Sequence, residues 1–403
     1  MIMRKECLAM FVGIVAGGFS LLTPAFAEMP GQEPVTVRAS EVPSIRLAAS
    51  EQKDLHEGSA GVKGLADRVR RIEEKLEDQG LGKWSERFTL SGVIEVEAGY
   101  EDLDFRDPEE QDTDSSDISL ATVEVGVDVD VAKHVKGHVL FKYEDDDDDD
   151  VFVDEGIIIL DGEEVVPLYL NAGKMYVPFG NFASHFISDP LTLELGETRE
   201  SAVKVGFAND MLDICLAAYN GDINETGESD DHIDNFVASA VLTLPEGMAP
   251  HIGLTMGVSW ISNMADTNGI QDALEEEGIS EINDYVEGFS AFLSLTFMDK
   301  LFFEGEYVCA TDHFEADDLD PGAKFEPSAW NLELAYLLLH NLEVALRYEG
   351  TDDTLNLLPE KQYGAAATYG LFENTSLSIE YLYGEFENDD ERTLLTAQLA
   401  IEF

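Results

Sequence analysis

The sequence predicts an all-β fold, a transmembrane antiparallel β-barrel of about 16 strands preceded by a short N-terminal coiled-coil helix. Three observations lead to this prediction. Apolar and polar residues alternate with period two through most of the chain after residue 87, which is typical of strands with one apolar face. Short and long connections alternate between these strands, as in outer-membrane barrels. The last segment, 392–403, alternates in the same way and ends on Phe403, as the closing strand of such barrels does.

The first 80 residues precede the predicted barrel. Residues 1–27 are typical of a secretory signal peptide, because Arg4 and Lys5 precede an apolar run that ends near a small-x-small cleavage site. Residues 28–58 contain three prolines and no period, which predicts a linker. Apolar residues in 59–80 recur at spacings of three and four, which predicts a helix. This helix is either a short periplasmic coiled coil that holds protomers together or a single amphipathic helix lying against the barrel.

The barrel is expected to span 88–403. No run of about 18 apolar residues follows the signal peptide, which excludes a helical membrane protein. An even strand count places both ends of the barrel on the periplasmic side. The predicted strands lie near 88–100, 118–131, 136–144, 151–160, 165–177, 202–208, 211–219, 234–244, 250–262, 285–298, 301–310, 328–338, 342–349, 360–370, 376–386 and 392–403.

Composition and motifs limit the classes of function that the chain is expected to have. The chain carries 83 acidic and 24 basic residues, a net charge of -59, which excludes nucleic acid as a default partner. Cys7 lies in the signal peptide, and Cys215 and Cys309 are predicted to be ordinary strand residues because they lack metal-ligand spacing. No nucleophile, zinc or phosphate-loop motif is present, so neither an enzyme nor a cofactor is expected. The function is therefore expected to lie in a pore.

The third long loop, 178–201, is the predicted pore constriction. Unlike the other long loops it is rich in Phe and Leu and poor in Asp, so we expect it to fold into the lumen. Two alternatives stay open: residues 191–195 form another membrane strand, or the loop packs on a neighbouring protomer. The polar groups expected to face the channel are Asn181, Ser184, His185, Asp189, Glu194, Glu197 and Arg199.

The predicted inner wall is mostly acidic. Rings of carboxylates favour cations, although inward carboxylates could also serve only to hydrate the lumen. The predicted pore-lining residues are Glu95, Glu97, Glu124, Asp128, Asp130, Lys142, Lys204, Glu333, Glu343, Arg347 and Glu380, with Glu402 at the end of the chain. A run of aspartates at one loop tip carries oxygen ligands suited to Ca²⁺ or Mg²⁺, but it lacks the spacing of a formed calcium loop. We therefore predict a solvated run and no metal at Asp145, Asp146, Asp147, Asp148, Asp149 and Asp150.

Two segments resemble the LbtU family of siderophore porins. One is the first strand, Phe-Thr-Leu-Ser-Gly-Val-Ile-Glu-Val-Glu-Ala-Gly-Tyr, which follows a signal peptide, linker and helix. The other is Gly-Lys-Met-Tyr-Val-Pro-Phe-Gly-Asn-Phe, followed by Ser-Asp-Pro-Leu-Thr-Leu-Glu-Leu-Gly-Glu-Thr-Arg. The resemblance covers residues 65–403 and implies an outer-membrane porin that takes up an iron-loaded siderophore without a plug domain. The chain also resembles phosphate-selective trimeric porins more distantly, but such pores need basic ladders and this predicted lumen is acidic.

The sequence thus leads to two functional hypotheses. The first is a passive outer-membrane channel for a ferric siderophore or another cationic or neutral small solute. The second is a structural or adhesive barrel whose acidic loops bind divalent cations. The expected partners are outer-membrane lipid, the barrel assembly machinery through the C-terminal strand, and further copies of the chain in a homotrimer.

Overall fold

A computed structural model describes residues 87–107, 111–145, 151–162, 165–227, 232–245, 247–276, 278–315 and 324–403. The predicted signal peptide, linker and coiled-coil helix lie outside these residues, as do residues 146–150 of the aspartate run. No helix in the described ranges is long and apolar enough to cross a bilayer.

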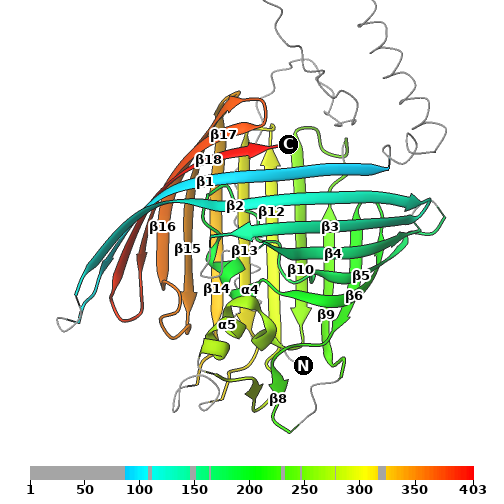
Figure 1. Cartoon of the computed structure of the whole chain (residues 1–403), viewed down its shortest axis with the longest axis horizontal. Helices are drawn as coiled ribbons and strands as arrows, with labels where there is room; N and C mark the ends of the chain where they lie inside the picture. Colours follow the sequence, from blue (N-terminus) through cyan, green and yellow to red (C-terminus); the bar gives the residue numbers. More distant parts are fainter. Residues whose placement is uncertain are drawn as a thin grey trace, which may run out of the picture.

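Sixteen antiparallel strands form a closed barrel, which confirms the predicted fold class (Figure 1). The last strand pairs with the first, so the sheet has no free edge. Phe403 and Gly92 exchange two main-chain hydrogen bonds at this closure. The barrel strands are β1 (Phe88–Asp104), β2 (Thr113–Ala132), β3 (Val135–Glu144), β4 (Val151–Asp161), β5 (Leu168–Tyr176), β6 (Arg199–Ala208), β7 (Leu212–Tyr219), β9 (Asn235–Thr243), β10 (Ile252–Ile261), β12 (Gly288–Phe297), β13 (Leu301–Ala310), β14 (Ser328–Leu339), β15 (Leu342–Asp352), β16 (Lys361–Phe372), β17 (Thr375–Glu385) and β18 (Glu391–Glu402).

The strands place apolar residues outside and polar residues inside. On β15, Leu346 is 60% exposed whereas its neighbour Arg347 is 2% exposed. The same alternation separates Leu334 from Glu333 on β14. Successive side chains of a strand point to opposite faces, so an apolar outer surface and a polar inner wall follow directly from period two.

The two ends of the barrel differ. At one end, which we call the short-turn end, neighbouring strands are joined by tight hairpins. Met298 and Asp299, between β12 and β13, have φ values of 53° and 54°. The N–H of Lys300 donates to the carbonyl of Phe297, so Met298 and Asp299 are the central residues of a β-turn, and positive φ at both matches the twist of a hairpin. The opposite, long-loop end carries the longer connections, as the alternation of short and long segments predicted.

The long connections contain structure that the sequence analysis treated as loop. Residues Leu191–Gly196 form helix α4, so the alternative of an additional membrane strand there is wrong. Between β10 and β12 lie the 3-10 turn η1 (Met264–Asp266), helix α5 (Asn268–Glu276) and strand β11 (Glu281–Ile282). Strand β11 pairs in parallel with β8 (Asn224–Glu225). Figure 1 shows α4 within the outline of the barrel and α5 nearer its long-loop end.

An apolar cluster joins these elements to the inner wall near the long-loop end. It packs α4, η1 and α5 against inward residues of β5 to β7, β9, β10, β13 and β14, so this part of the lumen is filled by side chains. The cluster contains Met175, Val177, Phe179, Leu195, Ala202, Ala217, Tyr219, Ile223, Val237, Ile261, Met264, Ala265, Ile270, Leu274, Ile282, Val286, Val308, Ala310, Phe314, Phe325 and Ala329.

Candidate functional site

The connection between β5 and β6, residues 177–198, folds into the barrel; we call it the luminal loop. Its first turn depends on Gly180, which has φ +81°. A Cβ at this position would lie 2.2 Å from the ring of Phe182. The N–H of Gly180 donates to the hydroxyl of Ser259 on β10, 3.0 Å away. Phe179, 2% exposed, inserts into the apolar cluster and holds the beginning of the loop against the wall.

Inward carboxylates of the wall accept hydrogen bonds from the main chain of the luminal loop. Glu306 on β13 accepts from the N–H groups of Asn181 at 2.8 Å and Phe182 at 2.7 Å. Glu333 on β14 accepts from the N–H of His185 at 2.8 Å. Each of these carboxylates is buried, so each satisfies donors that would otherwise be withdrawn from water unpaired.

The same pattern continues over the next strands. Glu380 on β17 accepts from the N–H groups of Ile187 at 2.8 Å and Ser188 at 3.1 Å. Glu349 on β15 accepts from the N–H of Leu191 at 2.8 Å, just where helix α4 begins. This acceptor satisfies one of the unpaired N–H groups at the start of the helix. The loop is therefore attached to β13, β14, β15 and β17 through its backbone.

Arg347 lies at the centre of this contact. Its guanidinium donates to Glu333 at 2.9 Å and to Glu349 at 3.3 Å, and all three side chains are fully buried. The same group donates to the loop carbonyls of Ser188 at 2.9 Å and Asp189 at 3.2 Å. One guanidinium thus compensates two buried carboxylates and fastens the loop, a combination that its five donors allow.

Arg347 makes two further contacts with the loop. It donates to the hydroxyl of Ser184, and it lies 4.3 Å from the centre of the Phe186 ring. Next to these residues, His185 places Nδ1 2.9 Å from Glu343 and Nε2 4.0 Å from Glu304. Burial lowers the pKa of His185, but its hydrogen bond to Glu343 and the surrounding carboxylates outweigh this and raise it.

The acidic side chains of the loop differ in exposure from the buried groups that anchor it. Asp189 and Glu194 are exposed to solvent and Glu197 is half-buried. Desolvation by the surrounding protein raises the pKa of all three carboxyls, and raises that of Glu197 to about 7. The positive charge of Lys142 opposes this effect at Asp189 and Glu197, and the charge of Arg392 opposes it at Glu194. The loop carboxyls are therefore within electrostatic range of Lys142 and Arg392, and Asp189 is also within range of Arg347.

The remaining loop residues named from the sequence differ in their surroundings. Asn181 and Ser184 have exposed side chains. Arg199, the first residue of β6, pairs with Asp154 and lies 5.1 Å from the centre of the Phe152 ring. A shift in the register of β3 and β4 falls beside Asp154, which is buried and also accepts from the Tyr176 hydroxyl at 3.1 Å.

Three residues predicted to line the pore, Glu333, Arg347 and Glu380, do lie on the inner wall. They are 1%, 2% and 1% exposed, because the luminal loop covers them, so they do not face open water. Glu343 is half-buried beside His185. These four residues therefore bind the luminal loop and do not line an open pore.

The other predicted lining residues lie away from the loop anchors. Glu95, Glu97, Glu124 and Lys142 are half-buried, and Lys142 pairs with Glu144 at 2.8 Å and Glu124 at 3.9 Å. Gln398 donates to Glu97 at 2.9 Å. Three of these residues are exposed: Asp128, Asp130 and Glu402. Asp128 lies 2.8 Å from His138. Lys204 lies 5.8 Å from the centre of the Tyr169 ring.

Sequence reasoning missed Glu304, Glu306 and Glu349. A signal for them was present, since Glu304 and Glu306 alternate with outward residues of β13, and Glu349 shares the inward face of Arg347. Cys215 and Cys309 are buried and are not joined by a disulfide, as expected for ordinary strand residues. No group of His, Cys, Asp and Glu suited to a metal ion occurs among the described residues.

Comparison with known proteins gives relatives in sequence and in fold. No protein-family model matches the chain. It is 26% identical over 282 residues to a UPF0422 protein of Coxiella burnetii, covering 66% of this chain and 59% of that protein. It is 24% identical over 318 residues to the UPF0422 protein lpp3030 of Legionella pneumophila, covering 73% of this chain and 58% of that protein. The matches thus span less than two thirds of the length of these relatives.

Among solved structures, the anion-selective porin from Comamonas acidovorans superposes with a TM-score of 0.53. The match covers 78% of this chain and 99% of the porin at 11% sequence identity. At this identity the likeness concerns the fold, a closed barrel of porin type.

Proposed function

We propose that the chain is an outer-membrane channel whose luminal loop narrows the passage for small hydrophilic solutes. The observation that carries the proposal is the attachment of residues 177–198 to the inner wall by buried carboxylates and Arg347. A loop held in this way restricts the lumen at a fixed place. The porin-like fold and the apolar outer surface support a location in the outer membrane.

The passage lies, in this proposal, between the exposed face of the luminal loop and the wall of β18 and β1 to β4. Glu95, Glu97 and Glu124 contribute carboxylates from the wall, and Asp189, Glu194 and Glu197 contribute them from the loop. Lys142 and Arg392 are the bases that face these loop acids. Because carboxylates outnumber bases here, the channel favours cations over anions.

The experiment is conductance of the purified chain in planar bilayers, with reversal potentials measured in a salt gradient. Discrete conductance steps and a reversal potential of cation-selective sign are expected. Replacement of both Glu95 and Glu97 by glutamine should shift this potential towards zero, whereas no shift would contradict their place in the passage.

The finer solute assignment rests on the resemblance to siderophore porins. We propose a ferric siderophore as one solute, tested by growth under iron limitation with and without the protein.

Assembly as a homotrimer, insertion by the barrel assembly machinery and a periplasmic coiled coil remain parts of the same proposal. Gel filtration with light scattering in detergent measures the oligomeric state.

The apolar cluster favours a second candidate, a structural or adhesive barrel. It fills part of the lumen near the long-loop end with α4, η1 and α5. A barrel closed in this way would show no conductance steps in the same bilayer experiment. Absence of conductance, with the barrel shown to be folded by circular dichroism, would therefore favour the structural role.

A further inference from the structure

A polar cavity lies on the inner wall near the short-turn end, away from the luminal loop. It has a volume of about 320 Å³ and is lined by residues of β4 to β7 and their turns. Its polar lining residues are Asp161, Tyr169, Asn171, Lys204 and Asp213. The proposed constriction uses none of these contacts, so the cavity requires a separate explanation.

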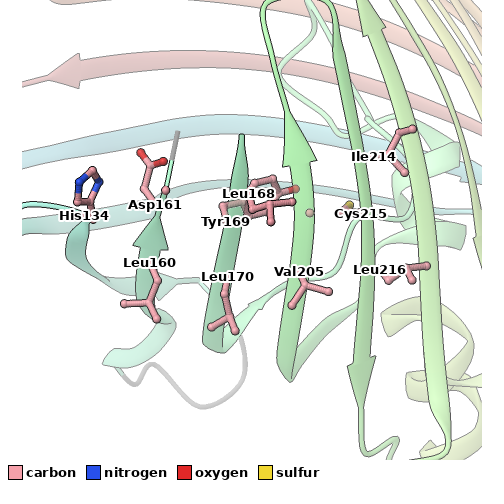
Figure 2. Close-up of a pocket in the computed structure, with 12 residues that line it drawn as sticks. His134, Leu160, Asp161, Leu168, Tyr169, Leu170, Val205, Ile214, Cys215 and Leu216 are labelled. Atoms are coloured by element: carbon pink, nitrogen blue, oxygen red, sulfur yellow. The ribbon is translucent and has the colours of Figure 1, made fainter. Parts of the chain in front are cut away.

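The outer side of the same wall has the opposite character. Leu160, Leu170, Val205 and Leu216 are register partners across β4 to β7 and form one apolar row. Figure 2 shows these side chains beside the apolar hollow that they line. The polar residues of the cavity occupy the intervening positions, which point into the barrel.

Lys204 and Arg392 differ from three other inner bases, because neither is paired with a carboxylate within the described residues. Lys142, Arg199 and Arg347 each pair with a carboxylate. Within the described part of the chain, no carboxylate lies within 4.0 Å of the Lys204 ammonium. Its recorded contact is with the Tyr169 ring, at 5.8 Å from the ring centre. The ammonium is therefore available to an anionic group of a ligand.

Acceptor groups line the same cavity as this ammonium. Asn171 is the direct cross-strand partner of Lys204, and its Oδ1 is enclosed without a hydrogen-bond partner in the described residues. The Tyr169 hydroxyl donates to Asp213 at 2.9 Å, which fixes that carboxylate at the far side of the ring. Gly206 makes this possible, because a Cβ there would lie 2.3 Å from the Tyr169 ring.

We infer that this cavity binds a small zwitterion of the α-amino acid type. Lys204 takes the ligand's carboxylate, while the carboxylate of Asp213 accepts from its ammonium. A simple anion would meet Asp213 and Asp161, and a simple amine would meet Lys204, so each would face an unfavourable charge. A ligand with both charges on neighbouring atoms satisfies the donor and the acceptor together.

The test is calorimetric titration of the detergent-solubilised full chain with L-alanine, and with acetate and methylammonium as probes that each carry one of its charges. We expect saturable binding of L-alanine and at least tenfold weaker binding of either single-charge probe. Lys204→Gln and Asp213→Asn should each weaken L-alanine at least tenfold, whereas Lys300→Gln, at a distant turn, should not.

Several results would overturn the inference: no saturable L-alanine binding, equal binding of acetate or methylammonium, or wild-type affinity in Lys204→Gln. Circular dichroism establishes that each variant is folded, and Lys204→Arg, which keeps the charge, provides a second variant with binding expected to be retained in part. Binding is measured without conductance, so a failure here is distinguishable from a failure of the proposed channel.

Discussion

Replacing Arg347 with methionine should release the luminal loop without opening the barrel. The substitution keeps an unbranched side chain but removes the one group among the described residues that pairs with both Glu333 and Glu349. Removing one partner of a buried ion pair costs about 3–5 kcal/mol, because the remaining charge is buried without compensation. The strands keep their main-chain ladders, so this cost falls mainly on the attachment of residues 177–198.

Hydrogen exchange at pH 8 measures this effect directly. The reporting amides are the N–H groups of His185 and Leu191, which donate to Glu333 and Glu349. A loss of about 3 kcal/mol in the free energy of local opening accelerates their exchange roughly 100-fold. Strand amides of β16 should exchange as in the wild type.

Two comparisons make the result decisive. Arg347→Lys should have an intermediate effect, because it keeps the charge but loses the planar set of donors. Lys300→Met removes a base at a distant turn and should change nothing. Wild-type exchange of the loop amides in Arg347→Met, with unchanged conductance, would refute the view that Arg347 holds the loop.

Three further substitutions each test one residue of the luminal loop, its anchors or helix α5. Glu306→Ala leaves two loop N–H groups without their acceptor. The free energy of unfolding should fall by roughly 1–3 kcal/mol per unsatisfied group, and the midpoint of denaturant unfolding should fall with it. The raised pKa of Glu197, about 7, means that its carboxylate is ionised above pH 7 and protonated below it. Cation preference should therefore decline as pH falls from about 8 to about 6, and Glu197→Gln should show a flatter reversal-potential profile. Gly269→Ala should loosen α5 in hydrogen exchange because its Cβ would lie 2.0 Å from the carbonyl oxygen of Glu194; Gly99→Ala, with nothing within 4 Å, is the control.

The barrel could be predicted from the sequence because the membrane imposes a simple rule on every strand. An outward residue such as Leu346 must be apolar, and its neighbour Arg347 can be polar only if it points inward. This rule repeats along the chain, so local pattern and global fold agree. Closure follows as well, since 392–403 carries the same pattern and pairs with β1.

The structure of the luminal loop could not be predicted in the same way. Leu191, Leu193 and Leu195 alternate as they would in a strand, yet residues Leu191–Gly196 form a helix. Pro190, the N-cap, is a local signal for a helix start, and a tertiary contact adds to it because Glu349 accepts the N–H of Leu191. The alternation of leucines does not contain that contact.

The role of the inner carboxylates could not be predicted from the alternation of apolar and polar residues either. Period two correctly places Glu333 and Glu380 on the inner wall. Whether water or protein covers that wall depends on a segment more than 100 residues away in the chain, bound by contacts such as Ile187 to Glu380. The alternation of apolar and polar residues along a strand carries no information about such a distant partner.

The attachment of the loop through its backbone has a consequence for how this barrel can diversify. Glu306, Glu333, Glu349 and Glu380 recognise N–H groups, which every residue except proline supplies. Substitutions at exposed loop positions such as Asp189 can therefore alter the chemistry of the lumen without detaching the loop. The wall fixes where the loop lies, while the identities of its exposed side chains remain open to change, so one scaffold can acquire new solute preferences by point mutation.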